Sequence, residues 1–397
     1  MNKYSPLTKQ APVAQRTAVY LDHHATTPVD PRVAEVAIRM MVEEFGNANG
    51  VENIHGEHAA SAVAEARDKV ARLLRAEPDD VYFTSGSTEA IQLAISHSIE
   101  THRSPLKIAV SRIEHKAVID TALRAERLGL AAVTWIEVDE KARLDRSGYK
   151  RVLQTGIDLV CVMAANNEVG TIYPIEEIVR EAREYGAKAL IDATQAVGRM
   201  PINLEELNAA YVVFSGHKIY SPKGIGALVS PIFERASVFG LQGAHHPTPN
   251  VSGIAALGSA CELMELEGEA ETRRLSQLRD LLQERLLHLV PDLVVNGDEA
   301  ARLPHNLHVS APGALNDVVL GHLRGKVSIS TGSACNTGAQ EPSHVLRAMR
   351  LPDARIDSCL RIGLGRTTTA SDIELAAVQI AQAIHDVRTA FPEDIDV

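Results

Sequence analysis

Apolar and polar positions along the chain follow two periods, and from about residue 79 these periods alternate. Short apolar runs lie at 81–84 (VYFT), 107–111, 159–164 and 188–192, and segments with helical spacing of apolar residues lie at 88–99, 115–129 and 175–186. This alternation predicts an α/β fold with a mostly parallel central sheet flanked by helices. Since ligands bind beyond the carboxyl ends of strands in such sheets, the residues that follow each strand are the first site candidates.

The pattern changes after two further apolar runs, at 211–215 and 224–230. Residues 262–290 have the spacing and interleaved charges of one long amphipathic helix. Short strands at 307–310 and 326–330 and a closing helix at 371–391 then predict a smaller α+β unit. A chain of 397 residues favours two domains, and this change of pattern is the expected transition between them.

Charge, cysteine usage and the N-terminal sequence exclude several classes of protein. The net charge is −11 with basic residues spread along the chain, so we expect no direct contact with nucleic acid. Neither a signal peptide nor an apolar run of 18 residues is present, which predicts a cytoplasmic protein without a membrane segment. The four cysteines are far apart and form no CxxC pair, so we expect no disulfide framework and no metal site.

Two groups at predicted strand ends are suited to an anionic, nitrogen-containing ligand. TSGSTEA (84–90) places Ser87 and Thr88 where a strand leads into a helix, whose free N–H groups and dipole favour a phosphate. An ordinary Ser/Thr helix cap is the alternative. Asp192 closes an apolar strand, so its carboxylate needs a cation or several donors, and a protonated pyridine nitrogen is one such cation. A cap or a structural ion pair is the alternative there.

Two further groups add amine and ring chemistry at the same predicted edge. Lys218 follows the strand YVVFS, where partial desolvation would allow it to lose its proton and form a Schiff base with a carbonyl cofactor. His115 follows the strand KIAVS, where its ring could stack on a flat cofactor, or simply cap a helix. A phosphate cup, a pyridinium partner, a Schiff-base lysine and a stacking ring together predict a pyridoxal 5'-phosphate (PLP) site.

The motifs that carry these residues resemble those of the NifS/IscS-like cysteine desulfurases, which are class V aminotransferase relatives of PLP fold type I. The resemblance runs from YLDHHATTPVDPRV (20–33) to LRIGLGRTTTASDIE (360–374) and so covers nearly the whole chain. It implies a large PLP-binding domain over 29–263. Residues 1–28 and 264–397 would form a small domain that carries the catalytic cysteine loop at about 329–345.

The resemblance also implies roles for individual residues. Lys218 would bear the cofactor and His115 would stack on its ring, while Asp192 would hold the pyridinium. Asn167 and Gln195 would contact the ring substituents, and the phosphate would be held by Ser87, Thr88, Ser215, His217 and, across a dimer interface, Thr248.

Substrate binding and sulfur acceptance are implied on the same basis. Arg361 would clamp the substrate carboxylate, with help from Asn167, because its planar fork suits a carboxylate; a surface salt bridge is the alternative. Cys335, in the loop STGSACNTGAQEPSHVLRAM (330–349), would be the nucleophile that accepts sulfur, the alternative being a packed small hydrophobe. For Cys161, Cys261 and Cys359 we expect structural roles.

One segment departs from the family's pattern. Where relatives carry GGGxExGxRxGT, this chain has the shorter GLQGAHHPTPNVSG (240–253), in which that arginine has no counterpart. His245 and His246 are either partial substitutes or ordinary loop residues. The first motif also differs, because His23 and His24 replace the usual residues before ATTP.

The implied activity is removal of sulfur from L-cysteine, which gives L-alanine and a persulfide on Cys335. The expected partners are a second copy of the chain and a sulfur acceptor from iron-sulfur assembly, tRNA thiolation or DNA phosphorothioation. Two other functions remain open: a selenocysteine lyase or other class V enzyme, and a weakly active sulfur-relay scaffold that needs a partner.

Overall fold

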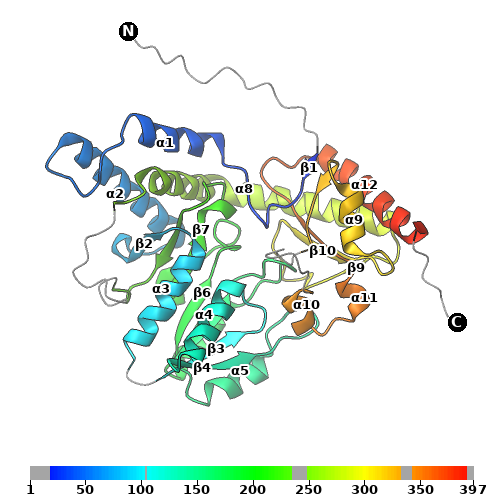
Figure 1. Ribbon diagram of the computed structural model, residues 1–397, viewed down its shortest axis with the longest axis horizontal. Coiled ribbons are helices and arrows are strands. Elements are labelled where there is room, and N and C mark those ends of the chain that lie inside the picture. Colours follow the sequence, from blue (N-terminus) through cyan, green and yellow to red (C-terminus); the bar gives the residue numbers. More distant parts are fainter. Residues whose placement is uncertain (1–17, 103–104, 235–247, 332–341, 391–397) are drawn as a thin grey trace, which may run out of the picture.

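The computed structural model describes residues 18–102, 105–234, 248–331 and 342–390. Its main feature is a seven-stranded sheet with the order β2-β8-β7-β6-β5-β3-β4 (Figure 1). The neighbours from β7 to β4 pair in parallel, and β8 pairs antiparallel with both β7 and β2, so the prediction of a mostly parallel sheet is confirmed. The strands are β2 (Val81–Thr84), β3 (Leu106–Ser111), β4 (Ala131–Ile136), β5 (Leu159–Met163), β6 (Lys188–Asp192), β7 (Tyr211–Ser215) and β8 (Gly226–Val229).

Helices cover both faces of this sheet, which explains why its inner strands are apolar without interruption. In β5, Leu159 and Cys161 belong to a core with α3 and α4, whereas Val160 and Val162 belong to a core on the opposite face with α2, α5 and α6. The helices are α2 (Ile54–Leu74), α3 (Ser87–Glu100), α4 (Lys116–Arg127), α5 (Arg146–Leu153), α6 (Ile175–Glu184) and the short α7 (Leu204–Leu207).

A separate core lies around two smaller sheets, as expected for the predicted α+β unit. One sheet has the order β12-β10-β9, and the other pairs β1 with β11 across more than 300 residues of sequence. The strands are β1 (Val19–Tyr20), β9 (Val294–Val295), β10 (Asn306–Ser310), β11 (Val327–Ser328) and β12 (Cys359–Gly363). The helices are α9 (Asn316–Leu323), α10 (His344–Ala348), α11 (Asp353–Ile356) and α12 (Ala370–Ala390).

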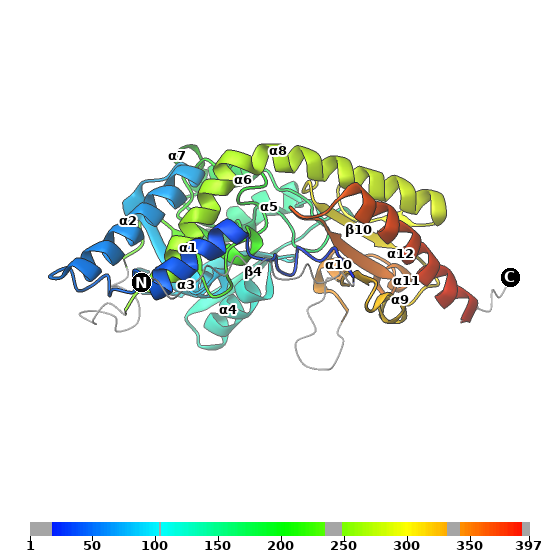
Figure 2. The ribbon, with the colours of Figure 1, turned by 90° about the horizontal axis from the view of Figure 1, so that it is seen from above.

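One long helix, α8 (Val251–Leu289), runs along both parts of the molecule (Figure 2). It begins at Val251, 11 residues before the predicted segment at 262–290, and is capped by Asn250, whose side chain accepts a hydrogen bond from the Gly253 N–H at 3.1 Å. Its first half packs on α2 and α1 (Pro31–Val42), and its second half packs on α12. The predicted domain boundary at 263/264 therefore falls inside α8, and the division into domains stays a prediction.

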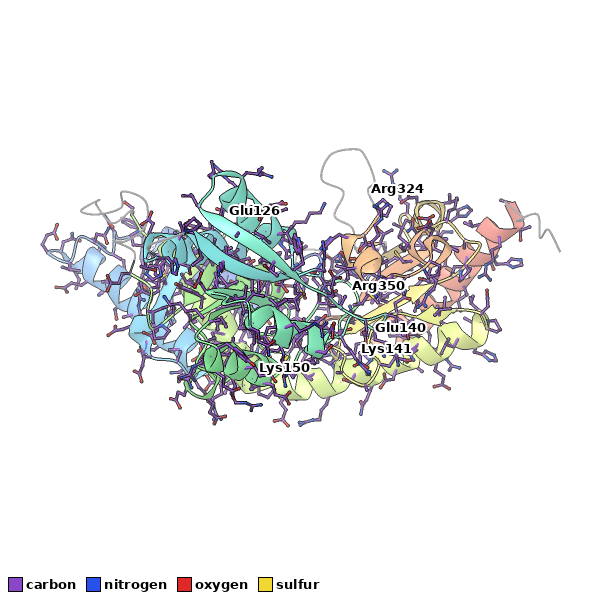
Figure 3. The ribbon with its side chains drawn as sticks, turned by 90° about the horizontal axis from the view of Figure 1, so that it is seen from below. Glu126, Glu140, Lys141, Lys150, Arg324 and Arg350 are labelled. Carbon is purple, nitrogen blue, oxygen red and sulfur yellow. The ribbon has the colours of Figure 1, made fainter. Side chains whose placement is uncertain are left out.

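The surface carries both signs of charge. On the face shown in Figure 3, the labelled exposed side chains include the acidic Glu126 and Glu140 and the basic Lys141, Lys150, Arg324 and Arg350. Among the described helices, none combines the length and apolar character that a bilayer crossing requires.

Candidate functional site

A cavity of about 930 Å³ lies where strands β5, β6 and β7 reach their carboxyl ends. Predicted site residues from six different segments line it: Ser87, Thr88, His115, Asn167, Asp192, Gln195, Ser215, His217, Lys218 and Arg361. Thr248 is exposed and does not line this cavity, and Cys335 lies outside the described residues, as do His245 and His246. The structure thus brings together every described candidate except the threonine that was expected to act across a dimer.

Asp192 is the last residue of β6 and lies at the inner wall of the cavity. Its side chain is 6% exposed, and Oδ1 accepts a hydrogen bond from the Thr194 N–H at 3.0 Å. The predicted alternative, a local cap, therefore accounts for one oxygen only. The other oxygen stays available to a donor in the cavity, and the nearby Thr194 Oγ1 is buried without a hydrogen-bond partner in the described structure.

Lys218 ends the short 3₁₀ helix η2 (Gly216–Lys218) that follows β7, and it is half-buried in the wall of the cavity. Its Nζ donates hydrogen bonds to the backbone carbonyls of His24 and Ala25, the latter at 2.7 Å. Burial, helped by the positive charge of Arg361, lowers the pKa of Lys218 to about 7. A large share of this amine is therefore neutral near neutral pH, the form that attacks a carbonyl.

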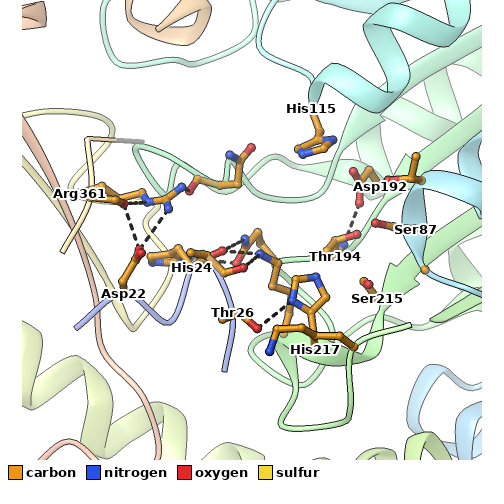
Figure 4. Close-up of a pocket in the computed structure, with 18 of the residues that line it drawn as sticks. Asp22, His24, Thr26, Ser87, His115, Asp192, Thr194, Ser215, His217 and Arg361 are labelled. Atoms are coloured by element: carbon orange, nitrogen blue, oxygen red, sulfur yellow. Dashed lines mark hydrogen bonds and ion pairs between the residues drawn. The ribbon is translucent and has the colours of Figure 1, made fainter. Parts of the chain in front are cut away.

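His115 precedes α4 and faces Asp192 across the cavity (Figure 4). Its Nδ1 accepts a hydrogen bond from the Ala117 N–H at 3.1 Å, so the helix-cap interpretation is correct for this nitrogen. Because Nδ1 is an acceptor, the neutral ring carries its proton on Nε2. Desolvation lowers the pKa of His115, opposed by the charge of Asp192, so the ring can accept a proton as well as pack on a flat ligand.

The start of α3 forms the polar end of the cavity. Gly86 precedes the helix at φ +151°, and a Cβ there would approach Ser215 Oγ to 3.3 Å, so glycine keeps the turn close to β7. No side chain caps this helix start, so Ser87 and Thr88 do not act as its cap. Free N–H groups at the first turn and the hydroxyls of Ser87, Thr88 and Ser215 thus form a cup suited to phosphate.

His217 lies beside this cup and is neutral there. Burial and the adjacent charges of Lys218 and Lys223 lower its pKa to about 4. Its Nδ1 lies 3.2 Å from Thr26 Oγ1 (Figure 4). A neutral ring at this position can donate one hydrogen bond to an anion without adding a charge.

Arg361, on β12, lies at the opposite side of the cavity from Ser87 and Ser215 (Figure 4). Its side chain is 8% exposed, which excludes the surface salt bridge that was the alternative interpretation. It donates to Asp22 Oδ1 at 3.2 Å, to Ser330 Oγ at 3.1 Å and to the Asn167 carbonyl at 3.1 Å. A guanidinium held in this way presents a fixed cation to a carboxylate in the cavity.

Sequence reasoning missed several cavity residues. Asp22 and His24 belong to the motif YLDHHATTP, where the two adjacent histidines were the available signal, while Thr194 and Lys223 had none that separates them from loop residues. The structural roles expected for the other cysteines agree with the structure. Cys161, Cys261 and Cys359 are buried and unpaired, and burial raises the pKa of each thiol, which keeps them protonated.

Comparisons with known proteins agree with this geometry. The chain is 38% identical over 382 residues to a protein named cysteine desulfurase IscS from Anaeromyxobacter sp. (strain Fw109-5), covering 94% of both chains. It is 36% identical over 383 residues to a protein of the same name from Dictyoglomus turgidum, covering 94% of this chain and 96% of that one.

Solved structures give the same result. One described as a NifS-like protein superposes with a TM-score of 0.83 at 30% identity, covering 93% of this chain and all of that one. Another, described as SspA in complex with cysteine, gives a TM-score of 0.76 at 28% identity, with coverage of 87% and 99%. The family described as Aminotransferase class-V matches residues 19–236 and 240–375. The chain therefore belongs to the class V aminotransferase family.

Proposed function

We propose that this chain is a PLP-dependent cysteine desulfurase that removes sulfur from L-cysteine and passes it to Cys335. The observation that carries the proposal is a lysine with a pKa of about 7 that shares one cavity with a buried carboxylate. The names of the relatives and the structure described with cysteine support the same reaction class.

The residues present fit PLP at both ends. The cup at the start of α3 offers backbone N–H groups and three hydroxyls to the phosphate, with the neutral His217 beside it. The free oxygen of Asp192 would keep the pyridine nitrogen protonated, and Lys218 would bind the aldehyde. Asn167 and Gln195 would contact the ring substituents. Bound PLP would supply a sink for the electron pair left at the substrate Cα.

Different side chains of the cavity would act on different groups of the substrate. Arg361 would hold the carboxylate of cysteine with the guanidinium N–H groups that are not engaged by Asp22, Ser330 and the Asn167 carbonyl. Lys218 Nζ, of which a large share is neutral near pH 7, would take the Cα proton. His115 lines the same cavity, and its ring would exchange a proton with the substrate thiol.

Sulfur transfer completes the reaction. The thiolate of Cys335 would attack the substrate sulfur, so that a new S–S bond forms while the Cβ–S bond breaks. The electron pair of the broken bond remains with the three-carbon fragment, which is protonated to alanine. The persulfide on Cys335 is then the product that an acceptor protein receives, and the class of that acceptor stays a prediction with the three possibilities given above.

A second copy of the chain is the other proposed partner. The turn between α1 and α2 exposes several large apolar side chains, with Phe45 66% exposed and Ile54 56% exposed. Met41, Val42 and Val51, from the same stretch of the chain, are also exposed. We propose that these side chains are buried in a homodimer, in which Thr248 would contribute to the partner's phosphate cup. The cytoplasmic location stays a prediction.

Two variants test the function. Lys218→Ala should abolish the yellow colour of the purified protein and its covalent retention of PLP, with Lys150→Ala, an exposed lysine outside the cavity, as the control that keeps both. Cys335→Ser should keep the colour and lose sulfide release from L-cysteine, with Cys261→Ser as the control. A colourless wild-type protein after reconstitution would overturn the cofactor assignment. Full alanine production by Cys335→Ser would favour a lyase that does not use this cysteine.

A further inference from the structure

His24 is buried beneath the cavity, on a segment that no regular element contains. Its side chain is 1% exposed, and its ring stacks on that of His305, with centroids 4.4 Å apart and planes at 29°. Both ring nitrogens have partners. Nδ1 lies 3.2 Å from Gln195 Oε1, and Nε2 lies 3.1 Å from Asn306 Nδ2.

Two backbone carbonyls determine which atom donates in each of these contacts. The amide nitrogen of Asn306 also donates to the Glu168 carbonyl at 2.8 Å, and a carbonyl only accepts, so the NH₂ group of Asn306 must face Nε2 of His24. Nε2 is therefore an acceptor, and the proton of the ring is on Nδ1. Similarly, Gln195 Nε2 donates to the His24 carbonyl at 3.2 Å, so the oxygen of the Gln195 amide faces Nδ1–H.

This arrangement of donors and acceptors requires the His24 ring to be neutral. Protonation would place an N–H on Nε2 against the NH₂ group of Asn306, so that two donors would face each other without an acceptor. The surroundings oppose protonation, since burial and the charges of Arg361 and Lys218 hold the pKa of His24 well below its usual range. The neighbouring His23 acts in the same direction.

The consequence reaches the cavity through Gln195. Its oxygen is engaged by His24, and one of its two amide hydrogens is engaged by the His24 carbonyl. In the described part of the chain, the second hydrogen has no partner, and Gln195 lines the cavity. The side chain therefore offers an N–H donor to the cavity. Without Nδ1–H, only the backbone carbonyl of residue 24 would hold the amide in this orientation, so the amide could more easily rotate and present its oxygen instead.

We propose that His24 is a positioning residue that orients the Gln195 amide so that it donates a hydrogen bond to the cofactor ring. This inference rests on the proposed function, because it assumes that PLP occupies the cavity. Asn306, on β10, fixes the tautomer of the His24 ring. Its hydrogen bond to the Glu168 carbonyl also fixes the loop that carries Asn167. Two ring contacts thus depend on one buried network.

The test uses the pH titration of the cofactor's visible absorption band, a readout that is independent of turnover. A donor to the ring oxygen stabilises its anionic form and weakens the hold of that oxygen on the neighbouring proton. Loss of the donor in His24→Leu should therefore raise the midpoint by roughly one pH unit, the effect of one hydrogen bond to a charged acceptor. The affinity of stripped protein for PLP should fall by about tenfold.

A conservative variant separates orientation from structural support. The asparagine introduced by His24→Asn has an amide nitrogen near the place of Nδ1, so it should restore the midpoint although it loses the stacking on His305 and much of the packing. A double-mutant cycle gives the second test, because His24→Leu should have no further effect on the midpoint in a Gln195→Ala background.

These experiments distinguish a His24 that orients the Gln195 amide from a His24 that only stabilises the fold. If the midpoints follow the thermal stabilities of His24→Leu and His24→Asn rather than the presence of a donor, the inference is wrong. Additive effects of His24→Leu and Gln195→Ala would equally refute it. A protein that binds no PLP at all would instead overturn the proposed function, a result that the wild-type spectrum shows directly.

Discussion

The titration of Lys218 is the property of this site that can be measured most directly. With a pKa of about 7, about 90% of the amine is neutral at pH 8, whereas a lysine with the ordinary pKa of 10.5 is about 0.3% neutral. The neutral fraction is thus roughly 300 times that of an exposed lysine at this pH, so the stripped protein should capture PLP at Lys218 faster than at an exposed lysine. The rate, measured by reductive trapping and peptide mapping, should reach half its maximum near pH 7.

Two neighbours allow the cause of the shift to be tested. Arg361 lowers the pKa of Lys218 and Asp22 raises it, so Arg361→Gln should move the midpoint up and Asp22→Asn should move it down. In the stripped protein, stability should also rise with pH between about 7 and 10.5, since the unfolded chain holds the lysine proton in this window. A midpoint above pH 9, or shifts of the same sign in both variants, would refute the electrostatic account.

Three further predictions concern residues other than Lys218. Burial alone would raise the pKa of Glu271, but the charges of Arg199 and Arg366 and the hydrogen bonds from these residues and Tyr220 lower it to about 2. The carboxylate should therefore stabilise the fold by about 3 kcal/mol over Glu271→Gln at pH 7 in urea unfolding, an advantage lost as pH falls from 4.5 to 2. The exposed Glu267→Gln should cost under about 1 kcal/mol. Arg361→Lys should raise the KM for L-cysteine about tenfold and change kcat less, because a lysine cannot hold a carboxylate with two parallel bonds; an unchanged KM would exclude Arg361 as the clamp. Asp192→Asn should lower alanine formation by about 10²-fold or more, and wild-type rates would show that this carboxylate does not act on the cofactor.

The fold could be predicted from the sequence where burial leaves a periodic signal. Strands β5 and β6 are buried on both faces, so their residues form unbroken apolar runs that stand out between the amphipathic helices. The start of α8 was placed too late, because Val251 to Cys261 pack against α1 and α2 and lack the charged stripe that marks the rest of the helix. Strand β1 has only two residues, which are too few to show an alternation of apolar and polar positions.

The site could be predicted only in part, for a related reason. Lys218, Asp192 and His115 lie at or just beyond strand ends, so the edge of the sheet brings them together and local sequence suffices. Asp22 and His24 reach the cavity through long-range contacts with Arg361 and Asn306, which lie about 340 and 280 residues away in the chain. Such contacts depend on how two sheets are placed against each other. The local sequence around each residue contains no pattern that predicts its distant partner.

The pairing of β1 with β11 has a consequence for biosynthesis. The segment that supplies Asp22 and His24 to the cavity is positioned by Val19 and Tyr20, whose partners are Val327 and Ser328. A ribosome makes the first pair at the start of translation and the second when about four fifths of the chain exists. The large sheet can form while the chain is being synthesised. The segment that supplies Asp22 and His24, which forms the floor of the cavity, cannot take its place until synthesis is nearly over. A truncated chain would therefore carry Lys218 in a cavity without its floor, so tight retention of the cofactor would be a property of the finished molecule.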